Sequence, residues 1–560
     1  MSVYTSPGVY PREIDLSNII PNIATTSAAL VGYSAKGDTS DIQLITNTQQ
    51  FIEEYGKPDI SSAHFFHETA LAFLQQGKVL YCLRVENDAL FGGVIIPPST
   101  ADDTDPQPLG TGQLTTDLDS SNIDLFGIFG KDPGTWNNDL AITISNVKGV
   151  AVTTADASTT ISSFDEYTFN INVYVKDADG VYQLKETWNV SRKTKLDARG
   201  AQLNLETKIN GFSKYITVTD DTTQADTVMP VAYATAPATG GSGVFTGGTN
   251  GDAITDADLT GADDAAGWDA FTNTDNTDIR ILLNGGEIGT EAAVQLKMKT
   301  VAEARKDCIA ILDVPRANST SGASSMASWR NATQNFNSSY TALYGPWVRK
   351  YDTYSDSLVY VPPSGYVGAQ FAYNDYVSQP WFPPAGLNRG LLGSVVGAEQ
   401  TFTEGERDTM YEAGINPIQV FRGEGIAIWG QKTQQTKASA LDRVNVRRLL
   451  IVIEKAVSVA MRSYLFELNS ELTRFRVTAQ ITEYLDLLSS QGAFQTEAGD
   501  DGFSVICNTT NNTPAVIDAN QMNVDLFIKP ARSIEYIQLS TIVTTSGVSF
   551  EELISKGSLI

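Results

Sequence analysis

The run Cys308-Ile-Ala-Ile-Leu-Asp-Val314 is apolar almost throughout and has the length of one buried β-strand. It follows a segment of helical length, Thr290 to Lys306, and another short apolar run, Ile279 to Leu283, precedes that segment. A strand, a helix and a second strand in this order are typical of a parallel sheet with helices packed on its faces. This stretch therefore predicts an α/β core domain.

The same alternation of strand and helix patterns occurs near the start of the chain. Ala29 to Tyr33 and Val79 to Val85 predict strands, and Phe65 to Gln76 predicts a helix between them. After Pro97 the sequence becomes rich in Thr, Asp, Gly and Asn, with short strand patterns such as Tyr167 to Val175. We therefore expect a discontinuous core domain that is interrupted by a β-rich insertion.

The insertion region also carries most of the net charge. Between Pro97 and Asp278 there are 27 acidic and 10 basic residues, which account for 17 of the 26 net negative charges of the chain. An acidic surface repels phosphates and anionic lipid head groups. We therefore expect no direct contact with nucleic acid. We also expect neither a secretion signal nor membrane insertion, because no apolar segment has the required pattern or length.

The longest helix signal runs from Ser439 or Asp442 to about Phe466, with apolar residues at three-to-four spacing. Basic residues next to or on this helix predict a positively charged face: Lys437, Arg443, Arg447 and Arg448. Such a face could dock on an acidic protein surface, since complementary charge sets register and specificity. The alternative is a solvated helix face without a partner.

Four further segments carry weaker patterns. Ser319 to Glu404 contains two Pro-Pro pairs and the aromatic residue Trp381, which predicts surface loops with packed aromatic anchors. Ile481 to Gln491 predicts a short helix. The alternating segments Val524 to Ile528 and Ile534 to Val543 predict two strands that pair with each other.

The first residues, Met1 to Pro21, have no helical period and include four prolines or glycines that favour extended backbone. The segment also carries apolar and aromatic residues that have no partner nearby in sequence: Val3, Tyr4, Val9, Tyr10 and Ile14. Twenty extended residues reach roughly 65 Å, since each residue spans about 3.3 Å. We therefore expect an extended arm that can contact a neighbouring molecule.

Candidate catalytic residues are few, because the chain has only two histidines, His64 and His67. A metal site would need more ligands than this pair and the adjacent Glu68 provide. Asp38, one of the histidines and Ser325 follow the Asp, His, Ser order of subtilisin-type proteases. The glycines expected around such residues are missing, so we predict neither a catalytic site nor a metal site.

No cofactor is predicted either. The P-loop pattern does not occur, and Gly423-Glu-Gly425 lacks the third glycine of a dinucleotide site. The turn Gly247-Gly-Thr-Asn-Gly-Asp252 resembles a calcium-binding repeat but occurs once, whereas such sites need stacked copies. The three cysteines are far apart, and we interpret them as buried residues of a protein made in a reducing compartment: Cys82, Cys308 and Cys507.

Several short motifs occur at both ends and in the middle of the chain. The opening is Ser6-Pro-Gly-Val-Tyr-Pro-Arg-Glu13, and the turn at Gly247 to Asp252 precedes the central part. The most informative group is Gly414-Ile-Asn-Pro417, Gly423-Glu-Gly425, Trp429-Gly430 and Arg443-Val-Asn-Val-Arg-Arg-Leu449. Asn512-Thr-Pro514 and Ser549-Phe-Glu551 follow near the end. In their order and spacing these motifs resemble contractile tail sheath proteins of phages and related injection systems.

With the patterns above, the resemblance implies a multidomain α/β and α+β fold. We expect an extended arm at residues 1–22, a first part of the core at 23–96 and the acidic insertion at 97–250. A central domain with a subtilisin-like, non-catalytic fold is expected at 251–430, and a C-terminal inner sheath domain with a terminal donor strand at 431–560. Fold analogy alone does not assign chemistry to such a domain.

The resemblance also implies the function. The chain would polymerise helically around an inner tube and contract to drive it through a cell envelope, with its terminal arms adding strands to neighbouring copies. The residues implied for the C-terminal strand are Ile534, Tyr536, Ile542 and Phe550, and the basic helix would face the tube. Expected partners are other copies of the chain, the tail tube, the baseplate and the tail terminator. The expected location is the virion tail sheath, assembled in the host cytoplasm. The alternatives are a tail-associated hydrolase and a receptor-binding or decoration protein.

Overall fold

The computed structural model describes residues 26–58, 64–98, 106–108, 125–148, 167–177, 179–197, 199–233, 237, 243–261, 266–286, 291–497 and 499–538. The chain divides into two compact units, one ending at Glu467 and the other beginning at Leu468. The expected N-terminal arm and the last two residues of the expected C-terminal strand, Ile542 and Phe550, lie outside the described residues.

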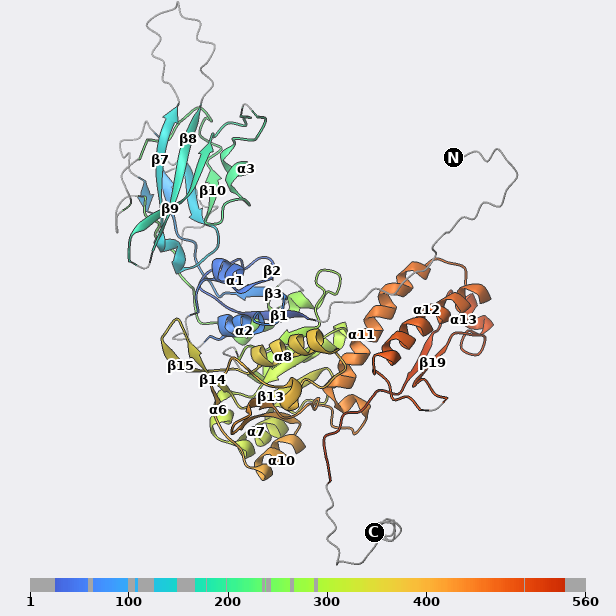
Figure 1. The fold of residues 1–560 in the computed structure, drawn as a ribbon. Helices are drawn as coiled ribbons and strands as arrows, with labels where there is room; N and C mark the ends of the chain where they lie inside the picture. Colours follow the sequence, from blue (N-terminus) through green and yellow to red (C-terminus); the bar gives the residue numbers. More distant parts are fainter. Residues whose placement is uncertain are drawn as a thin grey trace, which may run out of the picture. The chain divides into compact units, whose positions relative to one another are not determined.

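The first unit is built on an eight-stranded sheet with the order β18-β17-β13-β12-β11-β1-β3-β2 (Figure 1). The strands are β1 (Ser27–Tyr33), β2 (Gln43–Ile45), β3 (Val79–Val85), β11 (Ile281–Leu283), β12 (Ile309–Asp313), β13 (Thr341–Gly345), β17 (Ile415–Phe421) and β18 (Gly425–Ile428). The strands from β17 to β3 are parallel to one another, and β2 and β18 are antiparallel to their neighbours. Because β1 pairs with β11, from Ala28 with Ile281 to Leu30 with Leu283, the expected discontinuous core is confirmed.

Both faces of this sheet are covered by helices. Successive strand residues point to opposite faces, so Leu30 and Ile311 lie in one hydrophobic core while Ala29 and Leu312 lie in the other. The first core includes residues of α1 (Thr48–Tyr55), α2 (Phe66–Phe73), α8 (Ser364–Val377) and α11 (Val444–Met461). The second includes residues of α5 (Glu291–Arg305), α7 (Ala323–Trp329) and α10 (Glu404–Glu412). Burial on both faces explains why the strands are almost entirely apolar.

The segment from Ser319 to Glu404 differs from its prediction as surface loops. It supplies β13, an inner strand of the sheet, and α8, whose first nine residues are all buried. A helix that is buried all round has no amphipathic period, so pattern analysis does not reveal it. Gly368 allows this packing, because a Cβ atom there would lie 2.6 Å from the side chain of Leu283.

The expected insertion forms two sheets around a core of its own. One sheet has the order β10-β6-β4-β5 and the other β7-β8-β9. Their strands are β4 (Gly93–Ile96), β5 (Gln107–Pro108), β6 (Phe126–Gly130), β7 (Leu140–Lys148), β8 (Thr168–Lys176), β9 (Tyr182–Val190) and β10 (Ile216–Asp220). Phe126 of one sheet stacks on Phe169 of the other, with ring centroids 5.6 Å apart. The chain enters and leaves through paired residues, Leu90 with Thr249 and Gly93 with Thr246.

The remaining elements of the first unit are small. A three-stranded sheet, β15-β14-β16, consists of β14 (Val348–Asp352), β15 (Ser357–Val361) and β16 (Gly397–Ala398). The short helices are α3 (Leu205–Ile209), α4 (Asp256–Thr260), α6 (Arg316–Thr320) and α9 (Gly386–Arg389). The short helical turns are η2 (Thr135–Asp139), η3 (Gly267–Phe271), η4 (Arg330–Gln334), η5 (Ala440–Asp442) and η6 (Arg462–Tyr464).

The second unit contains α12 (Glu471–Ser490), α13 (Pro514–Asp518) and a two-stranded sheet of β19 (Phe503–Ile506) and β20 (Asp525–Ile528). The helix α12 begins well before the predicted Ile481, and the Ser470 side chain caps it by accepting from the Thr473 N–H at 3.2 Å. The predicted pairing of Val524 to Ile528 with Ile534 to Val543 is not formed by the described residues, because β20 pairs with β19 and residues 531–538 form no strand. Residues 539–543 of the predicted strand lie outside the described residues. Sequence alternation reveals a strand but not its partner.

Candidate assembly surfaces

The sheet of β19 and β20 is the first candidate surface. The two strands pair antiparallel from Phe503 with Ile528 to Ile506 with Asp525, and neither pairs with a further strand among the described residues. A two-stranded sheet is marginal by itself, and each outer edge presents N–H and C=O groups to which another strand can bond. This sheet is therefore suited to accept strands.

The chain after β20 is the second candidate surface. Residues 531–538 form no strand or helix, and Ile534, Tyr536 and Ile537 are 81%, 80% and 86% exposed. Two of these are residues that the sequence analysis assigned to a donor strand. Large apolar side chains that are exposed together in one segment mark an interaction site.

The expected basic face on α11 does not form as predicted. Arg447 and Arg448 are buried, each 5% exposed, and their charges are used inside the chain. Arg448 pairs with Asp375 at 2.6 Å, and Arg447 donates to Ser339 Oγ at 2.5 Å and stacks on the ring of Tyr340. No local sequence pattern reveals these partners, because they lie about seventy to a hundred residues away in the chain.

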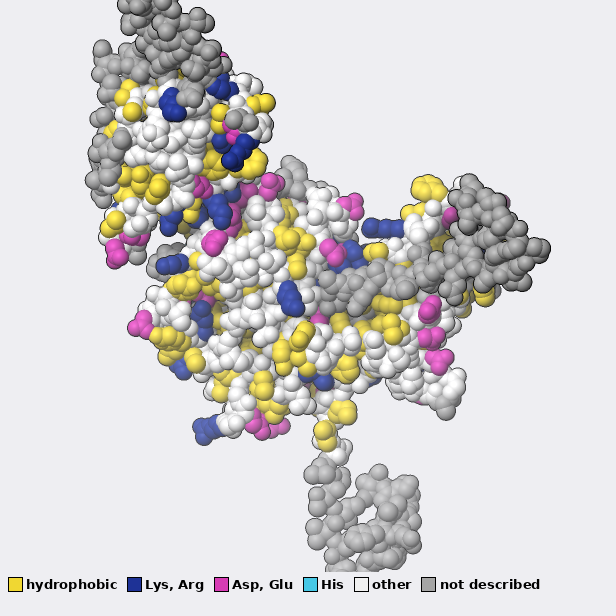
Figure 2. All heavy atoms as spheres, turned by 45° about the horizontal axis from the view of Figure 1, so that its top comes forward, with side chains coloured by type: hydrophobic (Ala, Val, Ile, Leu, Met, Phe, Trp, Pro, Cys, Tyr) yellow, Lys and Arg dark blue, Asp and Glu magenta, His cyan; other side chains and the backbone are white. Residues whose placement is uncertain are grey.

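Two other members of the predicted basic face remain accessible. Lys437 is exposed, and Arg443 is partly exposed and forms an ion pair with Asp442 at 3.0 Å. On the face of the molecule shown in Figure 2, Lys and Arg side chains are scattered among acidic, apolar and uncharged ones rather than gathered into a band. A continuous basic patch is therefore not a feature of that face.

The three residues with protease-like order lie in different local settings. Asp38 accepts from Ser40 and Gln43, and Ser325 accepts from Asn318 Nδ2 at 3.0 Å. The His67 ring lies 3.3 Å from Ser34 Oγ and 3.1 Å from the Tyr55 carbonyl. The partners named here, Ser40, Gln43, Asn318, Ser34 and Tyr55, all lie outside the predicted trio of Asp38, a histidine and Ser325.

The described part of the chain contains no group of three or more His, Cys, Asp and Glu side chains that could hold a metal ion. All three cysteines are buried, and burial raises the pKa of Cys308 to about 12.

Among the residues that the structure describes, no helix has both the length and the apolar character needed to cross a bilayer. Thr246 and Thr249, beside the glycine-rich turn, pair with Gly93 and Leu90 at the neck of the insertion.

Asp313, at the end of β12, is the most deeply buried acid of the central sheet. Its carboxylate accepts from the Ser364 backbone N–H at 2.7 Å and from Asn284 Nδ2 at 3.4 Å. Burial raises the pKa of Asp313 to about 7, although these hydrogen bonds act in the opposite direction. Open α/β folds place site residues at the carboxyl ends of their strands, but here the group ties β11, β12 and α8 together.

Comparison with known proteins identifies two family models that match successive parts of the chain. Residues 252–434 match the phage tail sheath protein central domain, and residues 436–544 match the phage tail sheath C-terminal domain. The tail sheath protein of Enterobacteria phage T4 is 33% identical over 330 residues, which are 56% of this chain and 49% of that protein. That of Vibrio phage KVP40 is 32% identical over 350 residues, or 58% and 50%. The chain thus spans about half the length of these two relatives.

Solved structures share the fold over most of the chain. The sheath tail protein of Listeria innocua has a TM-score of 0.55 at 11% identity, covering 90% of this chain and 95% of its own. The sheath tail protein of Desulfitobacterium hafniense has a TM-score of 0.54 at 13% identity, with coverages of 89% and 93%. The contracted sheath complex of an extracellular contractile injection system has a TM-score of 0.52 at 17% identity, with coverages of 99% and 100%.

Proposed function

Because the chain belongs to the phage tail sheath family, we propose that it is a structural subunit of a contractile tail sheath. Copies polymerise helically around an inner tube and contract to drive that tube through a cell envelope. The observation that carries this proposal is an acceptor and a donor in one chain: the open edges of β19 and β20, and the exposed apolar segment that follows β20. A chain with both features can link to copies of itself.

Strand addition suits a sheath that must change its lattice without losing its links. Main-chain hydrogen bonds are directional and contribute about 1 kcal/mol each, so several bonds hold two subunits together while their bodies rotate. In this proposal the segments containing Ile534 and Tyr536, and the N-terminal arm with Val9 and Tyr10, are the donors. Ile542 and Phe550 extend the C-terminal donor.

Contact with the inner tube is assigned to Lys437 and Arg443, the two members of the predicted basic set that keep exposed surface. Arg447 and Arg448 are withdrawn from this role because their charges are buried with internal partners. Charge reversal at Lys437 should weaken binding to preformed tubes, and more so at low salt. The baseplate and the tail terminator are the proposed partners at the two ends of the sheath, and assembly takes place in the host cytoplasm.

The proposed role requires no catalysis, since the energy for contraction is stored in the extended lattice. The protease-like order of Asp38, His67 and Ser325 then reflects the subtilisin-like topology expected of the central domain. A Ser325→Ala variant should assemble and contract as the parent does. A loss of contraction in that variant, with normal assembly, would instead support a hydrolase.

Electron microscopy of the purified full-length chain tests the assembly directly. Hollow cylinders are expected, and isolated particles under all assembly conditions would contradict the sheath function. The double variant Ile534→Asp and Tyr536→Asp should keep the circular dichroism of the monomer, because both side chains are exposed, and form no cylinders. The control is Leu184→Asp, which alters an exposed apolar residue of the insertion and should assemble normally. Cylinders from the double variant would rule out this donor segment.

A further inference from the structure

The first half of α11 is tied to the central domain by buried polar contacts. Asn445 donates to the Trp381 carbonyl at 3.2 Å, and Arg448 donates to the Pro380 carbonyl at 3.4 Å as well as pairing with Asp375. The apolar residues Val444 and Ile451 of the same helix belong to the core on one face of the eight-stranded sheet. The helix therefore packs as a layer of the central domain.

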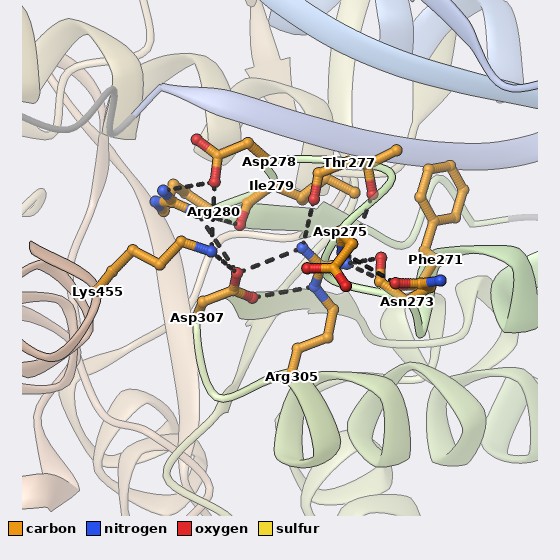
Figure 3. Close-up of polar contacts among 10 residues, drawn as sticks. All are labelled: Phe271, Asn273, Asp275, Thr277, Asp278, Ile279, Arg280, Arg305, Asp307 and Lys455. Carbon is orange, nitrogen blue, oxygen red and sulfur yellow. Dashed lines mark hydrogen bonds and ion pairs between the residues drawn. The ribbon is translucent and has the colours of Figure 1, made fainter. Parts of the chain in front are cut away.

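The second half of α11 is tied to the same domain by an ionic cluster (Figure 3). Lys455 Nζ lies 2.8 Å from Asp307 Oδ2 and 3.5 Å from Asp278 Oδ1, and its side chain is 16% exposed. Figure 3 shows Lys455 reaching from its helix towards the loops that bear these two carboxylates. Water screens the attraction between Lys455 and these carboxylates less than it screens the attraction within an exposed ion pair.

The carboxylates that receive Lys455 are themselves held in place. Asp307 accepts from Arg305 Nε at 3.0 Å, and Arg280 pairs with Asp278 at 2.8 Å and with Asp307 at 3.6 Å. Arg305 also donates to the backbone carbonyls of Phe271, Asn273 and Thr277, and these three hydrogen bonds fix the position of its guanidinium. Lys455 thus meets a preorganised acceptor rather than a flexible surface pair.

The backbone changes character directly after α11. The segment from Arg462 to Ser470 has only local backbone hydrogen bonds, such as Leu465 N to the Arg462 carbonyl at 3.3 Å. Phe466 has a φ of 70°, which is costly for a bulky residue, and its side chain is fully exposed. The boundary between the two compact units, after Glu467, lies within this segment.

The family model of the C-terminal domain begins at residue 436 and so includes α11. We propose a different mechanical boundary: α11 moves as one body with the central domain, Lys455 positions it there, and the joint of the subunit lies at Arg462–Ser470. If the chain is a contracting sheath subunit, a consequence that rests on the proposed function, any movement between its two units takes place after α11.

Hydrogen exchange on the full-length chain tests this boundary without requiring cylinders. Amides of α11 should open together with those of β12 and α5, while α12 and β19 exchange as a separate group. In the Lys455→Met variant, amide exchange in residues 449–461 should be faster by about tenfold, because a mostly buried ion pair is lost. Exchange in α12 should be unchanged. The matched control is Lys529→Met, which removes an exposed ion pair with Asp500 in the second unit and should leave α11 unchanged.

A second variant tests the joint itself. Inserting Gly-Ser between Glu467 and Leu468 should change exchange in neither α11 nor α12, because no regular element is interrupted. Three results would overturn the proposal: α11 amides that exchange with α12 rather than with β12, an unchanged α11 in Lys455→Met, or a Gly-Ser insertion that speeds exchange in α11. A failure to form cylinders would count against the sheath function alone, since none of these measurements depends on assembly.

Discussion

Arg448 Nη2 donates to Asp375 Oδ2 at 2.6 Å, and the two side chains are only 5% and 2% exposed. The guanidinium also lies 4.8 Å from the ring centroid of Phe371 in α8. This ion pair therefore joins α11 to α8. The charge of Arg448, predicted to face a partner, stabilises the fold of the chain instead.

Replacing Arg448 by Met should lower the free energy of unfolding by about 3 kcal/mol or more, because the buried carboxylate of Asp375 loses its ion pair with Arg448. Chemical denaturation measures the loss. The control Lys437→Met, at an exposed position, should change stability by less than about 0.5 kcal/mol. The double replacement Arg448→Met with Asp375→Leu should recover part of the loss. Wild-type stability in the single variant would show that the pair is not important to the fold.

Asp313 should make stability fall as the pH rises. Burial raises its folded-state pKa from the ordinary 3.8 to about 7, so between these values the folded chain holds a proton that the unfolded chain has released. The stabilising contribution is complete below about pH 4 and is lost as the pH approaches 7.

The variant Asp313→Asn should remove this dependence. It should match the parent near pH 4 and exceed it at pH 8 by at most about 4 kcal/mol, since one pKa unit corresponds to about 1.4 kcal/mol. Melting curves across this range, with Asp501→Asn as an exposed control, measure the difference. An equal change at pH 4 and pH 8 would show that Asp313 is ionised in the folded state throughout.

The insertion should be removable at its neck. Deleting Gly93 to Phe245 leaves Leu90 paired with Thr249 across a five-residue loop, a common hairpin length. The shortened chain should fold and assemble, as judged by circular dichroism and electron microscopy. A deletion of Ser99 to Thr239, at the composition boundaries, should aggregate, because it exposes Val94 and Ile96, which are buried in the insertion. If both deletions aggregate, the core is not independent of the insertion.

Removing the first twenty residues should abolish polymerisation. These residues include apolar and aromatic side chains with no local partner, and the prolines limit pairing before assembly. In our proposal they add to the open sheet of β19 and β20 in another copy. Sedimentation should show monomers whose circular dichroism and melting match those of the intact monomer. Cylinders that form as before would contradict strand exchange, and an unfolded monomer would make the arm part of its own core.

Local sequence determined the strands of the central sheet. Val79–Val85 was predicted at its observed bounds, and β12 lies within the predicted Cys308 to Val314, because strands buried on both faces are continuous apolar runs. The interrupted core also followed from sequence, since the change in composition at Pro97 separates two segments of the same texture.

Tertiary structure decided the parts that depend on partners distant in sequence. The first nine residues of α8 show no amphipathic period because all of them are buried, and β20 pairs with β19. From sequence alone Arg448 is indistinguishable from a solvated charge, because its partner Asp375 is distant in the chain and only the fold brings the two together. Periodicity indicates which residues are buried. It does not indicate which residues contact each other, because those partners are often far apart in the chain and no local pattern identifies them.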